Sequence, residues 1–182
     1  LRMLSMPDDP PLVGAAGRIE DDQGRQGNHP GPLMFWAAWP IHTLLGGSSW
    51  AYEAATAIVF GAWTVGALLL VRRRGPPPVL VGVTLAVLAL MVGYGLDGLT
   101  QPWNPWSSLA PYLVLVVAAW AALDGERWML PLAVAAGSFA IQGHVGYVAV
   151  VPPLVLVTLI GEIRAGAARR CPDRHQVRPL VG

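Results

Sequence analysis

Two long apolar segments, residues 51–71 and 79–96, lie on either side of a run of three arginines at 72–74. Each has about the length that an α-helix needs to cross roughly 30 Å of hydrocarbon, since an α-helix rises about 1.5 Å per residue. Arginines beside a membrane span stay on the cytoplasmic side, where basic residues accumulate. The sequence therefore predicts two antiparallel transmembrane helices joined by a cytoplasmic connection over residues 72–78, whose prolines prevent helix continuation.

The composition agrees with a membrane protein. Hydrophobic residues make up 54% of the 182 residues and charged residues only 13%, whereas a soluble domain is about a quarter charged. The basic residues are spread between apolar segments and form no single stripe, which excludes nucleic acid as an expected partner. The single cysteine, Cys171, has no partner for an intrachain disulfide, and the scattered histidines match no zinc-site spacing.

Three further apolar segments follow, at residues 109–123, 128–141 and 145–160, separated by short polar connections. The first two are shorter than the about 20 residues of a typical span, so we expect flanking residues or a thinned bilayer to accommodate them. With the first two spans they predict an all-α fold, a polytopic membrane helix bundle of about five transmembrane helices. The bilayer is thus the first expected partner.

A shorter apolar stretch, residues 33–46, contains Trp36, Trp39 and His42 and is interrupted by Pro40. It is too short to cross the bilayer, and its tryptophans favour an interfacial helix at the level of the lipid headgroups. The predicted organisation is an extracytoplasmic loop at 1–32, this interfacial helix at 33–46, a transmembrane bundle at 47–161 and a cytoplasmic polar tail at 162–182.

Alternation across the membrane places three arginine-containing segments on one side. If residues 72–78 are cytoplasmic, so are residues 124–127 and 162–182. The N-terminal loop, the tryptophan-rich loop at 97–108 and the turn at 142–147 then share the opposite face, where an aromatic belt is expected. We therefore predict a multi-pass protein of the cytoplasmic (inner) membrane whose candidate site residues lie at its outer face.

The motif Asn28-His29-Pro30-Gly31-Pro32 presents a histidine just before the interfacial helix. Pro30 keeps His29 out of helical geometry, and Pro32 suits the start of the helix. An imidazole titrates near neutral pH, which suits proton transfer or contact with phosphate. His29 is therefore a candidate catalytic residue and Asn28 a candidate substrate ligand. The alternative is a rigid loop in which the imidazole caps the helix or meets lipid headgroups.

Three amide and imidazole side chains complete the candidate binding residues. Gln142 and His144 lie between two apolar spans, and a polar group at that position needs a partner. They are predicted to contact substrate, with hydrogen bonding between helices as the alternative. Asn104 lies between Trp103 and Trp106, a combination that suits a sugar because CH faces stack on indole, although the same composition also anchors a helix at the interface.

Acidic residues in the N-terminal segment include the pair Asp8 and Asp9. A carboxylate can deprotonate an acceptor hydroxyl, or it can hold a divalent metal ion against a lipid phosphate. Asp9 is therefore a candidate catalytic base, and a divalent metal ion is the cofactor considered. Acidic pairs are also ordinary in any solvated loop.

The order of these motifs resembles a known family. A loop ending in His29-Pro30, a short interfacial helix, the step at Leu45 and Gly46, and a span that closes on arginines are similar to the C-type integral-membrane glycosyltransferases. That superfamily includes the protein O-mannosyltransferases and the bacterial aminoarabinose transferases. The stretches 28–33 and 142–147 resemble multispan actinobacterial proteins of this type.

The resemblance implies transfer of a sugar from a polyprenyl-phosphate donor to an acceptor at the outer face of the cytoplasmic membrane. It implies an acidic base in the first outer loop, His29 near the donor phosphate or the acceptor, and Arg18 as a planar partner for phosphate. The family has a span before that loop and this sequence does not, so we expect the chain to be a fragment. The alternative is a non-catalytic multispan protein, such as a transporter segment or an assembly subunit.

Overall fold

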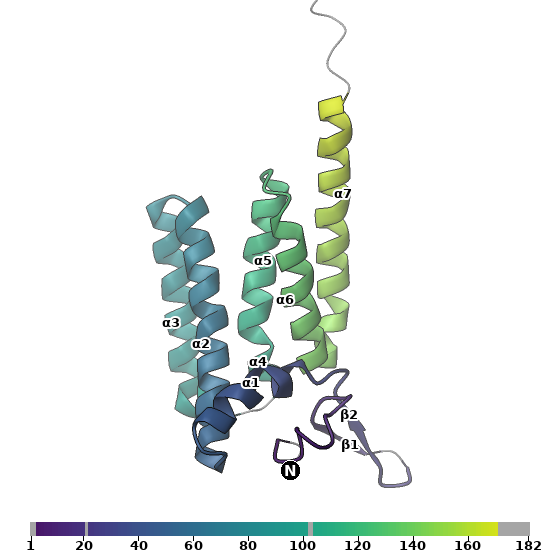
Figure 1. Ribbon diagram of the computed structural model, residues 1–182. Helices are drawn as coiled ribbons and strands as arrows, with labels where there is room; N and C mark the ends of the chain where they lie inside the picture. Colours follow the sequence, from purple (N-terminus) through teal and green to yellow (C-terminus); the bar gives the residue numbers. More distant parts are fainter. Residues whose placement is uncertain (1–2, 21, 102–103, 171–182) are drawn as a thin grey trace, which may run out of the picture.

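The computed structural model describes residues 3–20, 22–101 and 104–170 and has an all-α fold with one small sheet (Figure 1). The elements in chain order are β1 (Ala16–Glu20), β2 (Gln26–Asn28), α1 (Leu33–Leu44), α2 (Ser49–Arg74), α3 (Pro77–Thr100), α4 (Asn104–Ser107), α5 (Leu109–Leu123), α6 (Met129–Gly143), the 3-10 helix η1 (Val145–Ala149) and α7 (Val151–Arg170). Their order matches the predicted succession of an interfacial helix and apolar helices.

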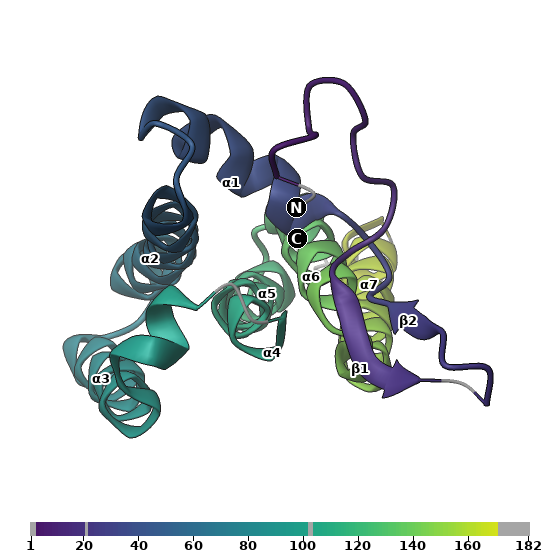
Figure 2. The same ribbon diagram turned by 90° about the horizontal axis from the view of Figure 1, so that it is seen from below.

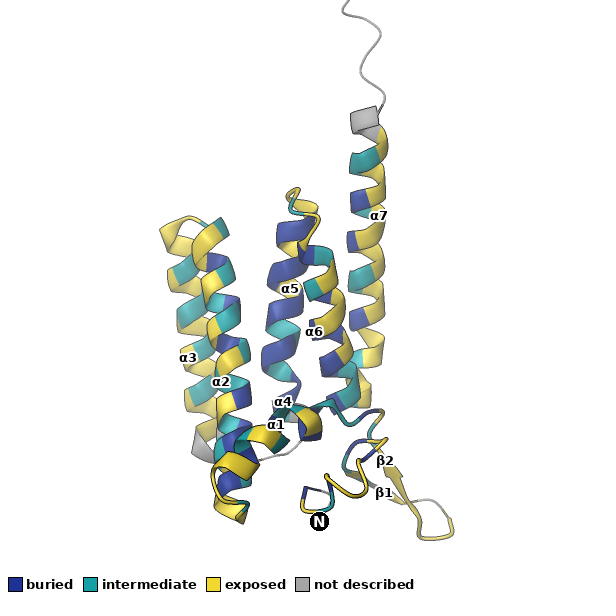
Figure 3. Ribbon diagram, in the orientation of Figure 1, coloured by how far each residue is buried: buried dark blue, intermediate teal, exposed yellow. Residues whose placement is uncertain are grey.

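The long helices run side by side, and α5 lies at the centre of the packing (Figures 1 and 2). It contacts α2, α6 and α7, whereas α3 packs mainly against α2. Alanines line the contact between α5 and α6, including the buried Ala118, Ala122, Ala133 and Ala140 around Leu115. Small side chains let two helix backbones approach closely, which is how helices associate in a membrane. Burial is accordingly concentrated on α5 and the surfaces that face it (Figure 3).

Three helices are long and apolar enough to cross a membrane: Ser49–Arg74, Pro77–Gly95 and Val145–Ala167. In Pro77–Gly95 only 6% of the apolar window is buried inside the protein, and large apolar side chains such as Val81, Leu85 and Val92 are exposed. In water such a surface would be costly, and a bilayer covers it without cost. The chain is therefore a membrane protein. The helices α5 and α6 are apolar but shorter, with 15 residues each.

The helix ends follow from local sequence. The Ser48 hydroxyl accepts a hydrogen bond from the Ala51 N–H at 3.1 Å and caps α2, which ends at Arg74 with Gly75 as its C-cap before the prolines. Proline is well suited to the first turn of a helix, so α3 begins at Pro77. Gly95 has φ of 69° and breaks the helical path of α3, which is where the predicted span ends. The residues beyond it form a further helical turn and α4 where a loop was predicted.

The N-terminal segment is more ordered than the predicted loop at 1–32. Its strands β1 and β2 pair antiparallel, with Ala16 opposite Asn28 and Glu20 opposite Gln26. The chain reverses at Gly24, whose φ of 74° favours glycine. The helix α1 is confirmed at 33–44 and continues through Pro40, and the chain leaves it through Gly46 and Gly47.

The described part of the predicted polar tail at 162–182 is helical. The helix α7 continues to Arg170, because the alanines and arginines of this stretch favour a helix. Glu162 is only 9% exposed, and its carboxylate pairs with the Arg127 guanidinium at 3.1 Å. The predicted last span also begins differently: η1 precedes α7, which accommodates Pro152 in its first turn. Residues 171–182, with Cys171, lie outside the described part of the chain.

Ion pairs join the three arginine-containing segments at one end of the bundle, which we call the arginine end. The Arg74 guanidinium lies 3.2 Å from the Asp124 carboxylate and 2.9 Å from that of Glu126. Arg127 in turn pairs with Glu162, so the α2–α3, α5–α6 and α7 segments meet there. The β-hairpin, α1 and η1 occupy the opposite end, called the hairpin end (Figure 1).

Candidate functional site

The hairpin end brings together two of the predicted site residues, His29 and His144. Their ring centroids are 5.4 Å apart with an angle of 36° between the ring planes. His29 is held by the hairpin, because the Gly14 N–H donates to its carbonyl and its own N–H donates to the Ala15 carbonyl, both at 2.9 Å. His144 follows the last residue of α6. We call these two residues the histidine pair.

A close backbone approach fixes the hairpin against α6. The Gly31 N–H donates to the Gln142 carbonyl at 3.2 Å. A Cβ at Gly31 would collide with the Gln142 side chain, so only glycine fits there. The Gln142 amide itself donates to the Ser138 hydroxyl at 3.1 Å. Gln142 therefore has a side-chain hydrogen bond within its own helix, which is not the predicted bond between helices, and its backbone also contacts the motif that carries His29.

The geometry gives the two imidazoles different chemistry. The Nδ1 of His144 accepts a hydrogen bond from the Gly146 N–H at 3.1 Å. In the neutral ring the proton is then on Nε2, which makes His144 a hydrogen-bond donor. The Nδ1 of His29 is buried and has no hydrogen-bond partner among the described residues. Its Nε2 is therefore the nitrogen available to a ligand.

Burial lowers the pKa of His29 below its ordinary value of 6.5, and the neighbouring His144 lowers it further. The buried surroundings solvate an imidazolium poorly, and protonation would add charge beside a second imidazole. His29 is thus held neutral at pH 7. A neutral imidazole with a free nitrogen is a competent proton acceptor.

The lowered pKa of His29 makes the free energy of unfolding depend on pH. Because the unfolded chain binds a proton at His29 more readily than the folded chain, unfolding becomes easier as the pH falls below 6.5 toward the lower folded pKa. We expect the unfolding midpoint of the protein in lipid nanodiscs to fall between pH 7.5 and 5.5, and to fall less in His29→Gln. An equal fall in both proteins would contradict the shift.

A row of aromatic side chains leads from the histidine pair to the lipid-facing side of the bundle. The ring of Tyr147 lies 6.3 Å from that of His144 and 5.3 Å from that of Tyr112, measured between centroids. Tyr94 at the end of α3 packs on Trp106 at 3.9 Å. We call Tyr94, Tyr112 and Tyr147 the tyrosine row.

An apolar groove of about 220 Å³ begins at this row. It is formed by α2, α3 and α5, and its lining includes Phe60, Val87, Leu90 and Leu113 together with Tyr94 and Tyr112. The groove runs between helices whose outer surfaces face the bilayer. The space is therefore suited to a hydrocarbon chain, with phenolic hydroxyls at one end.

Of the remaining predicted residues, Asp9 and Asn28 have described side chains, and both are exposed. Asp9 is exposed in a turn where its N–H donates to the Ser5 carbonyl, and its carboxylate has no hydrogen bond or ion pair among the described residues. Asn28 is exposed at the end of β2. Arg18 lies in β1 and Asn104 opens α4, but the side chains of both lie outside the described part.

Tyr94 and Tyr112 were not among the site residues predicted from the sequence. Both lie within a few residues of the predicted ends of apolar segments, and a tyrosine in that position is a usable signal for an interface site. Among the described residues no three histidine, cysteine, aspartate or glutamate side chains gather, so the expected divalent metal gains no ligand set from them.

The fold and these residues define an all-α membrane protein with a polar aromatic cluster at one end of its helix bundle. Comparisons of the chain with protein-family models, with curated proteins and with solved structures find no match. Support for a function therefore comes from the residues of the site.

Proposed function

We propose that this chain acts as a membrane glycosyltransferase, moving a sugar from a polyprenyl-phosphate donor to an acceptor at the outer face of the cytoplasmic membrane. One observation carries the proposal: the apolar groove between α2, α3 and α5 ends at the tyrosine row, and this row leads to the histidine pair. A lipid-linked substrate has the same order of parts, a hydrocarbon tail followed by a polar headgroup.

The tail of the donor would occupy the groove. Its walls are apolar side chains of three neighbouring helices, α2, α3 and α5. Burying a hydrocarbon chain against such walls needs no hydrogen bonds, and lipid can enter sideways from the bilayer. The phenol groups of Tyr94 and Tyr112 would then lie at the level of the phosphate.

The phosphate and the acceptor would meet the histidine pair. His144 offers an Nε2–H to a phosphate oxygen, because its Nδ1 is already bonded to the Gly146 N–H. His29 is neutral and accepts the proton of the acceptor hydroxyl at Nε2. The acceptor oxygen forms a bond to the anomeric carbon, the bond from that carbon to the phosphate oxygen breaks, and polyprenyl phosphate leaves with the electron pair.

A transfer assay tests the proposal directly. Purified protein in liposomes would receive a polyprenyl-phosphate hexose with a labelled sugar, and label would be followed into an alkyl glycoside acceptor. We expect transfer above that of protein-free liposomes. Absence of transfer across a panel of donor hexoses, by protein that is folded and inserted, would contradict the proposal.

The orientation is part of this proposal. Three arginines close α2 and the ion-paired segments at 124–127 and 162–170 share their end of the bundle, which favours a cytoplasmic location of the arginine end. The hairpin end then faces outward.

Single cysteines test this orientation in a Cys171→Ser background. Cysteine at position 26 of the exposed hairpin should react with an impermeant thiol reagent added to intact cells, whereas cysteine at position 73 should react only after permeabilisation. The reverse pattern would overturn the orientation.

A non-catalytic multispan protein is the second candidate. It is favoured by the isolation of Asp9, because no carboxylate of the described residues contacts the histidine pair. Binding of the lipid-phosphate donor without transfer would support this alternative.

A further inference from the structure

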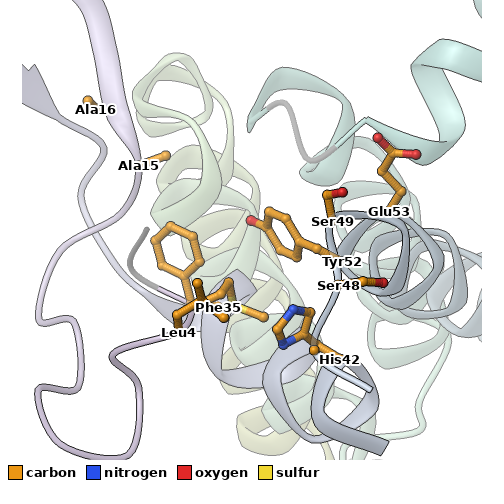
Figure 4. A pocket seen from close by; sticks show the side chains of 11 residues that line it. Leu4, Ala15, Ala16, Phe35, His42, Ser48, Ser49, Tyr52 and Glu53 are labelled. Carbon is orange, nitrogen blue, oxygen red and sulfur yellow. The ribbon is translucent and has the colours of Figure 1, made fainter. Parts of the chain in front are cut away.

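A second cavity, of about 460 Å³, lies at the hairpin end between the N-terminal segment and the junction of α1 with α2 (Figure 4). Its volume falls in the range of about 300–1,000 Å³ that is usual for small-molecule sites. One wall is apolar and includes Met3, Leu4 and Phe35, and the polar residues His42, Ser48, Ser49, Tyr52 and Glu53 also line it.

His42 is the residue that marks this cavity as a ligand site. It is 5% exposed, no hydrogen bond joins its imidazole to another described residue, and its nitrogens are not among the fully buried unpartnered atoms, so they border the open space of the cavity. Its ring meets the Tyr52 ring edge-on at 6.2 Å between centroids, which fixes the imidazole toward the cavity (Figure 4). Polar groups this far buried normally bond to protein or water. A ligand in the cavity would supply the missing partner.

The other polar groups show which ligand chemistry fits. Ser48 caps α2 through its oxygen, so its hydroxyl proton remains free to donate, and Ser49 adds a second hydroxyl. Glu53 lies on the exposed side of α2 and also lines the cavity, and a carboxylate can accept hydrogen bonds from a ligand. The negative charge of Glu53 disfavours an anionic ligand. The hydroxyl groups beside it are uncharged and add no further charge to hold a cation. A neutral molecule with several hydroxyls matches this mixture.

We propose that this cavity binds a saccharide, with the CH face of a pyranose on Phe35 and Tyr52 and its hydroxyls on His42, Ser48 and Glu53. Aromatic rings with nearby donors and acceptors serve both sides of such a ligand. The inference goes beyond the proposed function, since binding requires no transfer. The cavity also adjoins the hairpin that holds His29: Ala15 lines it, and the Ala15 carbonyl accepts the His29 N–H at 2.9 Å.

Magnetic resonance of isotope-labelled histidines in nanodisc-embedded protein tests the assignment. Methyl and hexyl β-glucoside and methyl α-mannoside would be titrated separately, to about 20 mM, well above a dissociation constant of about 1 mM. We expect at least one sugar to shift the His42 signal in a saturable way and to leave His29 and His144 unchanged. Tighter binding of the hexyl than of the methyl glucoside would identify a glycolipid headgroup, and equal binding a free sugar.

No shift of the His42 signal with any of these sugars would overturn the inference, as would a shift with inorganic phosphate in their place. These measurements use no polyprenyl-phosphate donor and no sugar transfer. Their outcome is therefore independent of whether the chain is a glycosyltransferase.

A matched variant tests the role of the imidazole nitrogens. His42→Phe retains a ring against Tyr52 and removes both nitrogens, so we expect about tenfold weaker sugar binding by calorimetry, the loss of about one hydrogen bond. Thr43→Ala, exposed on the same helix, should bind like the wild type. Unchanged binding by His42→Phe would contradict the assignment.

Discussion

Replacing His29 by glutamine is expected to lower the rate of sugar transfer by about a hundredfold or more, the usual contribution of a general base. Glutamine retains polarity and similar size but cannot accept a proton from the acceptor hydroxyl. The effect should fall on kcat more than on KM, because the donor tail and phosphate would be bound by other groups. The transfer assay in liposomes measures both values.

The pH dependence separates a base from a positioning residue. If His29 accepts the proton, wild-type activity falls as the pH drops below 6.5 through the lowered pKa of His29. The residual activity of His29→Gln should not show this fall at low pH. Gln26→Ala is a suitable control, since Gln26 is exposed in the same hairpin and its side-chain amide donates to the carboxylate of the exposed Glu20 at 3.4 Å. A variant His29→Gln with the rate and pH profile of the wild type would remove His29 from the mechanism.

Replacing Gly137 by alanine is expected to destabilise the bundle by about 1–3 kcal/mol, the usual cost of an overpacked core. A Cβ at Gly137 would come within 2.6 Å of the Val151 side chain and 3.5 Å of Leu115, which is fully buried. Neither neighbour has room to move, because they lie in the contact between α5, α6 and α7. Unfolding by denaturing detergent, followed by circular dichroism, measures the change.

The matched control is Gly66→Ala in α2, where an added Cβ meets nothing within 4 Å. Both positions are inside helices, so alanine brings the same gain in helix propensity, of about 0.5–1 kcal/mol. We expect the two substitutions to change the free energy of unfolding in opposite directions. Stabilisation at both positions would show that α6 and α7 are less closely packed than described.

The apolar helices were predictable because each is encoded locally. The predicted segment at 109–123 agrees with α5 residue for residue, and the turn at 124–127 connects it to α6. Long apolar runs need no information from the rest of the chain to become helices in a membrane. The features that the sequence did not predict occur where distant contacts or weak local signals decide, as in the β-hairpin and the continuation of the α7 helix past Glu162.

The candidate site was predictable only in part. The motifs around His29 and His144 both stood out in sequence, but the 5.4 Å between their rings depends on the hairpin folding back over the end of α6. Gly31 makes that approach possible by leaving room for Gln142. The tyrosine row could not be predicted from local sequence, since Tyr94, Tyr112 and Tyr147 come from three separate elements that meet only in the folded chain.

The sequence by itself determined that this chain is an all-α membrane protein and which of its segments share an end, because hydropathy, prolines and arginines act locally and against the bilayer. The arginines at 72–74 and the alternation of apolar segments predicted that residues 124–127 and 162–182 share their side, and the ion pairs of Arg74 and Arg127 bring Arg74, residues 124–127 and Glu162 together at one end. Only the tertiary structure decided which polar side chains meet. It left Asp9 isolated, paired His29 with His144 and exposed the unpartnered nitrogens of His42 to a cavity, since such contacts depend on packing between residues far apart in the chain.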